Sequence, residues 1–205
     1  SNALTGVVPV IVNNSTILAE VENGTKTSHS RITAGDSIGI IAAADSDIYI
    51  IAGGLAAAGA NAAGASINTA ILKNDIQAHA GTWTELMTTA TPAVQTSSNG
   101  IRIPNRNERR RGIIIFANGN EDVVMVSVSA GAGGSNAITG VINTLVVRNT
   151  VKATSREHVT ISVKKAAGSS TNDTDPLPGV YIEAHDDTEL LNLAGALSAG
   201  GSVGV

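Results

Sequence analysis

Short runs of β-branched and aliphatic residues alternate along this chain with tracts of Gly and Ala. The runs are four to eight residues long, are rich in Val, Ile and Thr, and end at Gly, Asn or Asp. They occupy residues 48–51, 66–72, 123–128, 141–147 and 190–193. Runs of this length and composition are typical of β-strands. The pattern therefore predicts an all-β chain.

The Gly/Ala tracts cover residues 52–65 and 130–140. The three Ala residues at 56–58 favour a short helix, but each nearby Gly costs about 0.8–1 kcal/mol in a helix interior. Small side chains with repeated Gly suit tight corners and closely approaching backbones. We therefore expect strands and turns here. A membrane span is disfavoured because Asn61 interrupts the tract and bulky apolar residues are few.

The same order of parts recurs along the chain. Residues 42–78 align with residues 117–153 at a constant offset of 75, which places Asn61, Asn68 and Asn74 on Asn136, Asn143 and Asn149. A repeat of this length favours a stacked, elongated architecture over a compact catalytic domain. What recurs is Gly, Ala, Asn and β-branched residues, which is the composition of a scaffold.

Two partial copies flank the full units. Residues 6–19 align with 140–153 and resemble only the second half of a unit, whereas 184–205 resemble only the first half. We therefore expect a piece of a longer array. Ser1-Asn2-Ala3 resembles the remnant of a cleaved affinity tag. The remainder, 4–205, is predicted to be one β-solenoid segment whose units cover 4–34 (partial), 35–111, 112–178 and 179–205 (partial).

Composition narrows the function classes. The chain has one Trp, one Phe and two Tyr, so small and β-branched residues must fill the interior, which suits narrow layers. A net charge of −4 gives no reason to expect nucleic acid or an anionic membrane as partner. Without cysteine the chain forms neither a disulfide nor a thiolate zinc site, and both oxidising and reducing compartments are allowed.

Polar spacers rich in Pro, Thr and Ser separate the units at 80–111 and 155–178, and we expect them to be surface excursions. The first contains the strongest concentration of positive charge in the chain. Its arginines are Arg102, Arg106, Arg109, Arg110 and Arg111. One hypothesis is contact with an anionic glycan or an acidic partner. A merely solvated loop is the alternative.

No motif predicts a catalytic residue, a metal site or a cofactor. Gly131–Gly134 lacks the spacing of a nucleotide-binding loop, and Gly pairs recur at 53–54 and 200–201, so a repeated turn is expected. The four histidines are isolated. Carboxylates cluster at 45–47, 121–122, 173–175 and 186–189. None fits an EF-hand loop; solvated turns are the expected structure, with calcium binding left open.

Two repeated phrases carry a family resemblance. The first reads Ile-Ala-Gly-Gly-Leu-Ala-Ala-Ala-Gly at 51–59, Gly-Ala-Ser-Ile-Asn-Thr at 64–69 and Asn-Asp-Ile-Gln-Ala at 74–78, and residues 129–153 carry the same pattern. These phrases resemble repeats of the large filamentous, leukotoxin-like and haemagglutinin-like adhesins of Gram-negative bacteria. The resemblance covers most of 6–205 apart from the spacers. It implies a right-handed parallel β-helix, exported through the outer membrane to the cell surface.

The resulting expectation is a non-enzymatic stalk or passenger segment of a secreted adhesin that serves cell adhesion and virulence. Its insertion loops would make the contacts. The expected partners are neighbouring modules of a longer chain and a host glycan or surface protein, with no nucleic acid and no membrane insertion. Two alternatives stay open. One is a β-helical polysaccharide-degrading enzyme, recognised by carboxylates and arginines of adjacent coils converging in one groove. The other is a non-catalytic β-sandwich binding module.

Overall fold

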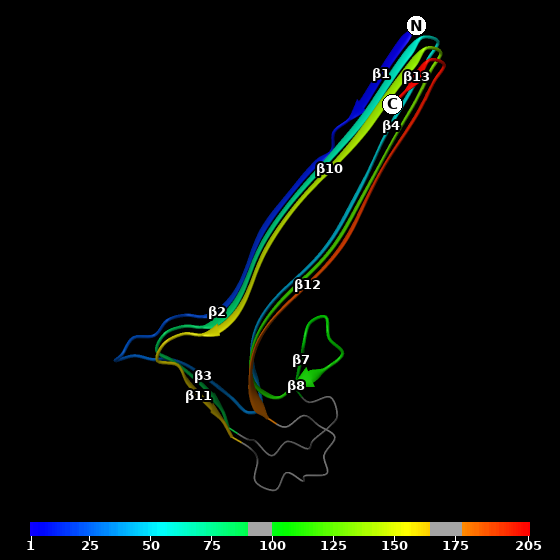
Figure 1. Ribbon diagram of the computed structural model, residues 1–205. Coiled ribbons are helices and arrows are strands. Elements are labelled where there is room, and N and C mark those ends of the chain that lie inside the picture. The colour runs from blue at the N-terminus through cyan, green and yellow to red at the C-terminus, as the bar shows by residue number, and fades with distance from the viewer. Residues whose placement is uncertain (90–99, 165–177) are drawn as a thin grey trace.

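The computed structural model describes residues 1–89, 100–164 and 178–205, and these ranges contain strands, turns and loops but no helix (Figure 1). The prediction of an all-β chain is confirmed. The strands are β1 (Asn2–Val7), β2 (Val10–Val21), β3 (Ser30–Ala34), β4 (Ile38–Ala58), β5 (Asn61–Ala80), β6 (Thr84–Thr88), β7 (Ile101–Arg102), β8 (Arg109–Arg110), β9 (Gly112–Gly133), β10 (Asn136–Ser155), β11 (Thr160–Val163), β12 (Gly179–Gly200) and β13 (Val203–Gly204).

Three parallel sheets make up most of the described part of the chain. The first long sheet contains β1, β2, β5, β10 and β13; the second long sheet contains β4, β9 and β12; and the short sheet contains β3, β6 and β11. The chain visits the three sheets in the same order three times, and we call these passes layer 1 (2–58), layer 2 (61–133) and layer 3 (136–200). Among the named strands only β7 and β8 pair antiparallel, as a hairpin.

The offset of the sequence repeat equals the offset between paired residues of neighbouring strands in the sheets. Layer 3 pairs with layer 2 in the first long sheet at the predicted offset of 75, with Asn61 beside Asn136 and Asn68 beside Asn143. The same offset relates β4 to β9, so that Ala42 lies beside Ala117. The alignment of 6–19 with 140–153 also holds, because β5 pairs with β1 and β2 on one side and with β10 on the other.

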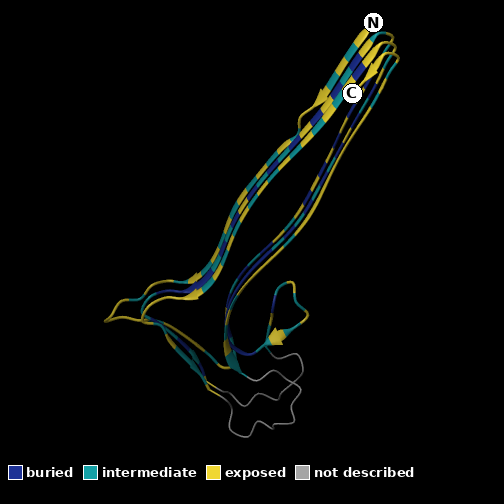
Figure 2. Ribbon diagram, in the orientation of Figure 1, coloured by how far each residue is buried: buried dark blue, intermediate teal, exposed yellow. Residues whose placement is uncertain are grey.

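Side chains alternate in direction along each long strand, so every second one points into the space between the two long sheets. At one end the short sheet joins them, and Ile76, Leu86, Ile113 and Ile115 fill the interior. Toward the other end the interior residues become small. A Cβ on Gly54 would lie 3.0 Å from the carbonyl oxygen of Ala65, so the two sheets approach closely there. Figure 2 shows the burial concentrated in the middle layer.

The tract around Ala56 is strand rather than helix, because β4 continues to Ala58. The predicted Gly turn needs one correction. Gly53 and Gly54 lie within β4, whereas the stacked turns contain Gly59, Gly134 and Gly201. A Cβ on Gly134 would lie 2.1 Å from the Gly59 carbonyl oxygen, and one on Gly201 2.3 Å from that of Gly134. Only Gly allows the backbones of successive layers to meet this closely.

The interpretation of the spacers as surface excursions is wrong for part of each. Residues 84–88 of the first spacer form β6 and residues 160–163 of the second form β11, and together with β3 they build the short sheet. Leu86 is fully buried. Residues 90–99 and 165–177 of the spacers lie outside the described residues. The expected units begin close to β4, β9 and β12, and Asn2 and Ala3 of the presumed tag remnant pair with β5.

Candidate functional site

The charged side chains of the described residues lie at one end of the molecule. Residues 48–72, 123–147 and 190–205 contain no Asp, Glu, Lys or Arg. They stack on one another and on residues 1–12, and we call this uncharged part the arm. The rest, which includes the short sheet, is the base. Both termini lie at the tip of the arm (Figure 1). Acidic and basic side chains of the described residues are therefore confined to the base, whereas the polar side chains of the arm are uncharged, such as Asn68 and Asn143.

The hairpin of β7 and β8 covers the outer face of the second long sheet in the base. Its turn contains Asn105 at a φ of 56°, and the Ile103 amide donates to the Glu108 carbonyl oxygen at 3.1 Å. The Ile103 side chain is fully buried against Ile114 and Phe116. This packing explains why residues 113–116 are apolar without alternation: two side chains face the interior and two lie under the hairpin.

Two of the five candidate arginines fasten the hairpin to layer 3. Arg110 forms ion pairs with Glu183 of β12 and with Glu108 (3.0 Å), and its Cζ lies 4.6 Å from the centre of the Tyr181 ring. The hydrogen bond to Glu183 raises the pKa of Arg110 above its usual value, and burial opposes it only in part. Arg106 also pairs with Glu108 and Glu183. Both arginines therefore have an intramolecular role.

Arg111 fastens layer 2 to layer 1. It is buried, and its Nε donates to Oδ1 of Asp36 at 3.0 Å. Burial by itself would raise the pKa of Asp36, but hydrogen bonds from Arg111 and Ser37 and the charge of Arg111 outweigh it, so this pKa is lowered. The structure thus gathers the five arginines on one hairpin, and only Arg102 and Arg109 are exposed.

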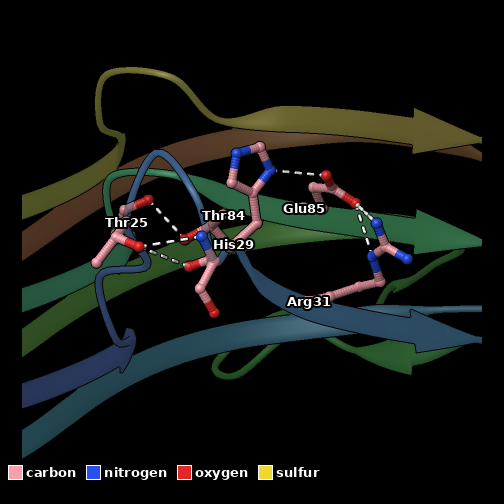
Figure 3. Close-up of polar contacts among 7 residues, drawn as sticks. Thr25, His29, Arg31, Thr84 and Glu85 are labelled. Carbon is pink, nitrogen blue, oxygen red and sulfur yellow. Dashed lines mark hydrogen bonds and ion pairs between the residues drawn. The ribbon is translucent and has the colours of Figure 1, made fainter.

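A second polar cluster lies at the corner between the first long sheet and the short sheet (Figure 3). His29, Trp83 and His158 take equivalent places in the three layers. The Trp83 and His158 rings stack with centroids 3.9 Å apart, and the His29 ring lies 5.7 Å from Trp83. Trp83 and His158 both have a φ of 56°, which is uncommon for side chains of this size. The histidines at 29 and 158 are therefore not isolated, and the offset of 75 between Trp83 and His158 was the available signal.

Glu85 of layer 2 joins this cluster to layer 1. Its Oε1 lies 2.7 Å from Nδ1 of His29, and its Oε2 accepts from Nε of Arg31 at 2.7 Å (Figure 3). The hydrogen bond with His29 lowers the pKa of Glu85; burial opposes this shift, and Arg31 adds to it. The neighbouring Thr84 hydroxyl donates to the Gly81 carbonyl oxygen at 2.6 Å. These groups are engaged with one another, which suits joining layers more than acid–base chemistry.

The interior of the base contains a buried carboxyl group. Glu121 accepts hydrogen bonds from Nδ2 of Asn74 (2.9 Å), from Nδ2 of Asn149 (2.6 Å) and from the Thr188 hydroxyl (3.2 Å). Burial raises the pKa of Glu121, the nearby charge of Asp186 adds to the rise, and the hydrogen bonds oppose it. This group was missed from sequence, where 121–122 was expected to be a solvated turn.

The expectation of solvated turns is wrong for three of the four acidic clusters. Residues 45–47, 121–122 and 186–189 lie within β4, β9 and β12. The fourth, at 173–175, lies outside the described residues. In the described ranges, no group of three or more His, Asp or Glu side chains is placed to hold a metal ion.

The raised pKa of Glu121 gives a testable pH dependence. The folded protein holds this proton more tightly than the unfolded chain, so stability falls as pH rises from the ordinary Glu value of 4.5 through the raised one. Asp36 and Glu85 have lowered pKa values, and their contributions decline only in more acidic solution. In Glu121→Gln the remaining oxygen can still accept from Asn74, and when the Asn149 side-chain amide turns over, its Oδ1, which has no partner, can accept from the new amide. We therefore expect this variant to gain stability over the wild type between about pH 5 and pH 7.5.

Urea unfolding of both proteins across this range checks the expectation. All other titratable groups are common to the two proteins, so the difference between them isolates Glu121. Parallel pH profiles would contradict a raised pKa at this position.

Three surface hollows in the described part of the chain lie on the arm, and none is lined by Asp, Glu, Lys or Arg. None of the described ranges forms a helix with the length and apolarity of a membrane-spanning segment. Comparison with protein-family models, with curated proteins and with solved structures finds no match to this chain.

Proposed function

We propose that residues 4–205 are a segment of a right-handed parallel β-helix that serves as a stalk in a secreted bacterial surface adhesin. The observation that carries this proposal is the parallel stacking of three layers, in register, through the same three sheets. Each strand of a layer hydrogen-bonds to the equivalent strand of the next. Such a structure gains length by adding layers, and its stability grows with each interface between neighbours.

The side-chain chemistry supports a structural role over catalysis. A polysaccharide-degrading enzyme would need carboxylates and arginines of adjacent layers free to act in one groove. Here the carboxylates of Asp36, Glu85 and Glu183 are paired with arginines, and the arm hollows contain no charged side chain. An antiparallel β-sandwich module would also differ from the parallel pairing of the long strands.

In this proposal the protein lies outside the cell, continues into neighbouring modules, and contacts a host glycan or surface protein through its hairpin. Arg102 and Arg109 would make the contact, because both are exposed on the hairpin; Arg109 also donates to the Gly100 carbonyl oxygen at 2.9 Å. An anionic glycan is the ligand class that suits two exposed guanidinium groups.

The experiment is a screen of sulfated glycans and host-matrix proteins with the wild type, with a double variant Arg102→Ser/Arg109→Ser, and with Arg156→Ser as control. Arg156 is also exposed but lies outside the hairpin. Surface charge pairs contribute up to about 1 kcal/mol each, so the double variant should bind roughly 5- to 30-fold more weakly. The control should bind like the wild type.

Binding is also expected to weaken as salt is raised. Equal binding by the wild type and the double variant, or no binding by either, would remove the hairpin as the contact site.

A further inference from the structure

The outer face of the second long sheet is apolar along the arm. Tyr49, Val124 and Leu191 form one row across the three strands, and Ile51, Val126 and Leu193 form the next. Further along, Leu55, Ala130 and Leu197 form another row. Ile51 is 80% exposed, Leu55 79% and Leu197 70%. Single exposed aliphatic residues are ordinary, but a contiguous uncharged patch marks an interaction surface.

The outer face of the first long sheet is uncharged and mostly apolar over the same length, with Thr69 and Thr144 in its one polar row between Ile71 and Ile67. Val12, Ile71 and Val146 form one row. Ile67 and Ile142 lie side by side further along, and Ala63 and Ile138 follow. Ile138 and Ile142 are each 58% exposed. The arm therefore presents two apolar faces on opposite sides.

The two faces have complementary relief. Close contacts between the two sheets show which rows lie at the same level, that is, at the same position along the strands. A Cβ on Gly54 would meet the Ala65 carbonyl oxygen at 3.0 Å, and one on Gly64 would meet that of Ala130 at 3.3 Å. The bulky row of Leu55 and Leu197 thus lies at the level of a flat row on the other face. That flat row is Gly6, Ala65 and Gly140.

The next row shows the reverse arrangement. Gly53 and Gly195 leave the second long sheet nearly flat on both sides of Val128. At this level the first long sheet carries Ile67 and Ile142. Ridges on one face therefore lie opposite hollows on the other, as required for packing two sheets together.

The charges that border the two faces are also complementary. Asp47, Asp122 and Glu189 form an acidic row across the second long sheet where the arm begins. Lys73 and Arg148 form a basic pair at the equivalent place on the first long sheet. Like charges side by side on neighbouring strands are unfavourable, and an opposing row of the other sign relieves them.

We propose that the arms of separate copies stack laterally, with the second long sheet of one copy against the first long sheet of the next. When one copy is displaced from the next perpendicular to the sheets, with the two arms parallel, the bulky rows of one face meet the flat rows of the other. The same displacement places the acidic row of one copy against the basic pair of the next. The two contacting surfaces differ, so the contact is heterologous and repeats without closing. This inference rests on the two faces alone and is independent of the proposed adhesion.

The area of the face sets the strength of the contact. Five rows on three strands span about 33 Å by 14 Å, so the contact covers roughly 900 Å² counted over both copies. Specific interfaces bury about 1,200–2,000 Å² in total. Three layers should therefore associate weakly and reversibly, and each additional layer widens the contact.

Sedimentation equilibrium from about 10 µM to 1 mM tests the proposal with two variants. One carries Leu55→Arg/Leu197→Arg on the second long sheet, and the other carries Ile138→Arg/Ile142→Arg on the first. All four residues are exposed, so folding should be retained, and circular dichroism checks it. The wild type should associate as concentration rises, and each variant alone should show at least a tenfold larger dissociation constant.

The decisive measurement is an equimolar mixture of the two variants. Each retains one intact face, so the mixture should form heterodimers that do not grow further. Leu18→Arg, on the outer face of the first long sheet in the base, is the matched control and should associate like the wild type.

Several outcomes would overturn the proposal. One is a wild type that stays monomeric at 1 mM. Others are a first-sheet variant that associates like the wild type, as pairing of two second sheets would give, and a mixture that stays monomeric. Binding of the wild type to phosphatidylcholine vesicles without self-association would assign the apolar faces to a lipid surface instead.

Discussion

Replacing Gly112 by Ala is expected to lower the free energy of unfolding by about 3–5 kcal/mol. Gly112 begins β9 with a φ of +100°, which strains any residue with a side chain. A Cβ there would also lie 2.2 Å from the carbonyl oxygen of Gly179 and 2.6 Å from its amide nitrogen. Relief requires the backbone to move where layers 2 and 3 meet. Urea unfolding followed by circular dichroism measures the loss.

Gly140→Ala is the matched control. Gly140 lies in β10 on the outer face of the first long sheet, and a Cβ there would meet no atom within 4 Å. The same substitution should change the unfolding free energy by less than about 0.5 kcal/mol. Similar losses at both positions would show that close backbone approach at Gly112 does not limit stability.

Phe116→Ala should cost about 3–5 kcal/mol, because the side chain is fully buried between β9 and the hairpin. It also removes the ring that lies 5.7 Å from the Arg106 guanidinium. The hairpin should therefore loosen, and trypsin should cleave after Arg102 or Arg109 much faster than in the wild type. Thermal unfolding and a timed digest give the two readouts.

Tyr49→Ala is the control for this change. Tyr49 is a second aromatic residue on the outer face of the second long sheet, but it is 64% exposed. Its removal should cost less than about 1 kcal/mol and leave the digest unchanged. If the hairpin of the Phe116→Ala variant resists trypsin as well as that of the wild type, packing against Phe116 does not hold the hairpin on the sheet. Phe116→Leu should restore most of the stability if apolar volume is what the site requires.

The register of the long sheets was predictable because stacking places equivalent residues on top of one another. The positions that recur at 75, such as Asn68 with Asn143, are neighbours in the first long sheet and share one environment. Gly59 and Gly134 recur because their stacked turns bring the backbones of successive layers together, and Ala42 and Ala117 recur because both face the interior. The constant offset across residues 42–78 therefore predicted the pairing register of both long sheets.

The base was harder to predict because its packing joins residues that are distant in sequence. Ile103 covers Phe116 only after the hairpin folds back, and no local pattern encodes that step. The uninterrupted apolar run at 113–116 was the one visible sign of burial on both faces. Glu121 was missed because a carboxylate beside Asp122 resembles a surface turn, whereas its partners Asn74 and Asn149 lie on the opposite long sheet, 47 and 28 residues away in the sequence.

The three layers differ in length at only some of their corners. The turn at the arm tip is brief in every layer, at 59–60, 134–135 and 201–202. The connection that follows the short sheet varies widely, covering 35–37 in layer 1, 89–111 in layer 2 and 164–178 in layer 3. This connection therefore accommodates additional residues without disturbing the pairing of the strands on either side. For protein engineering, this corner is an acceptor site for foreign peptides. An epitope inserted into any one layer would be displayed at a fixed position along the axis on which the layers stack.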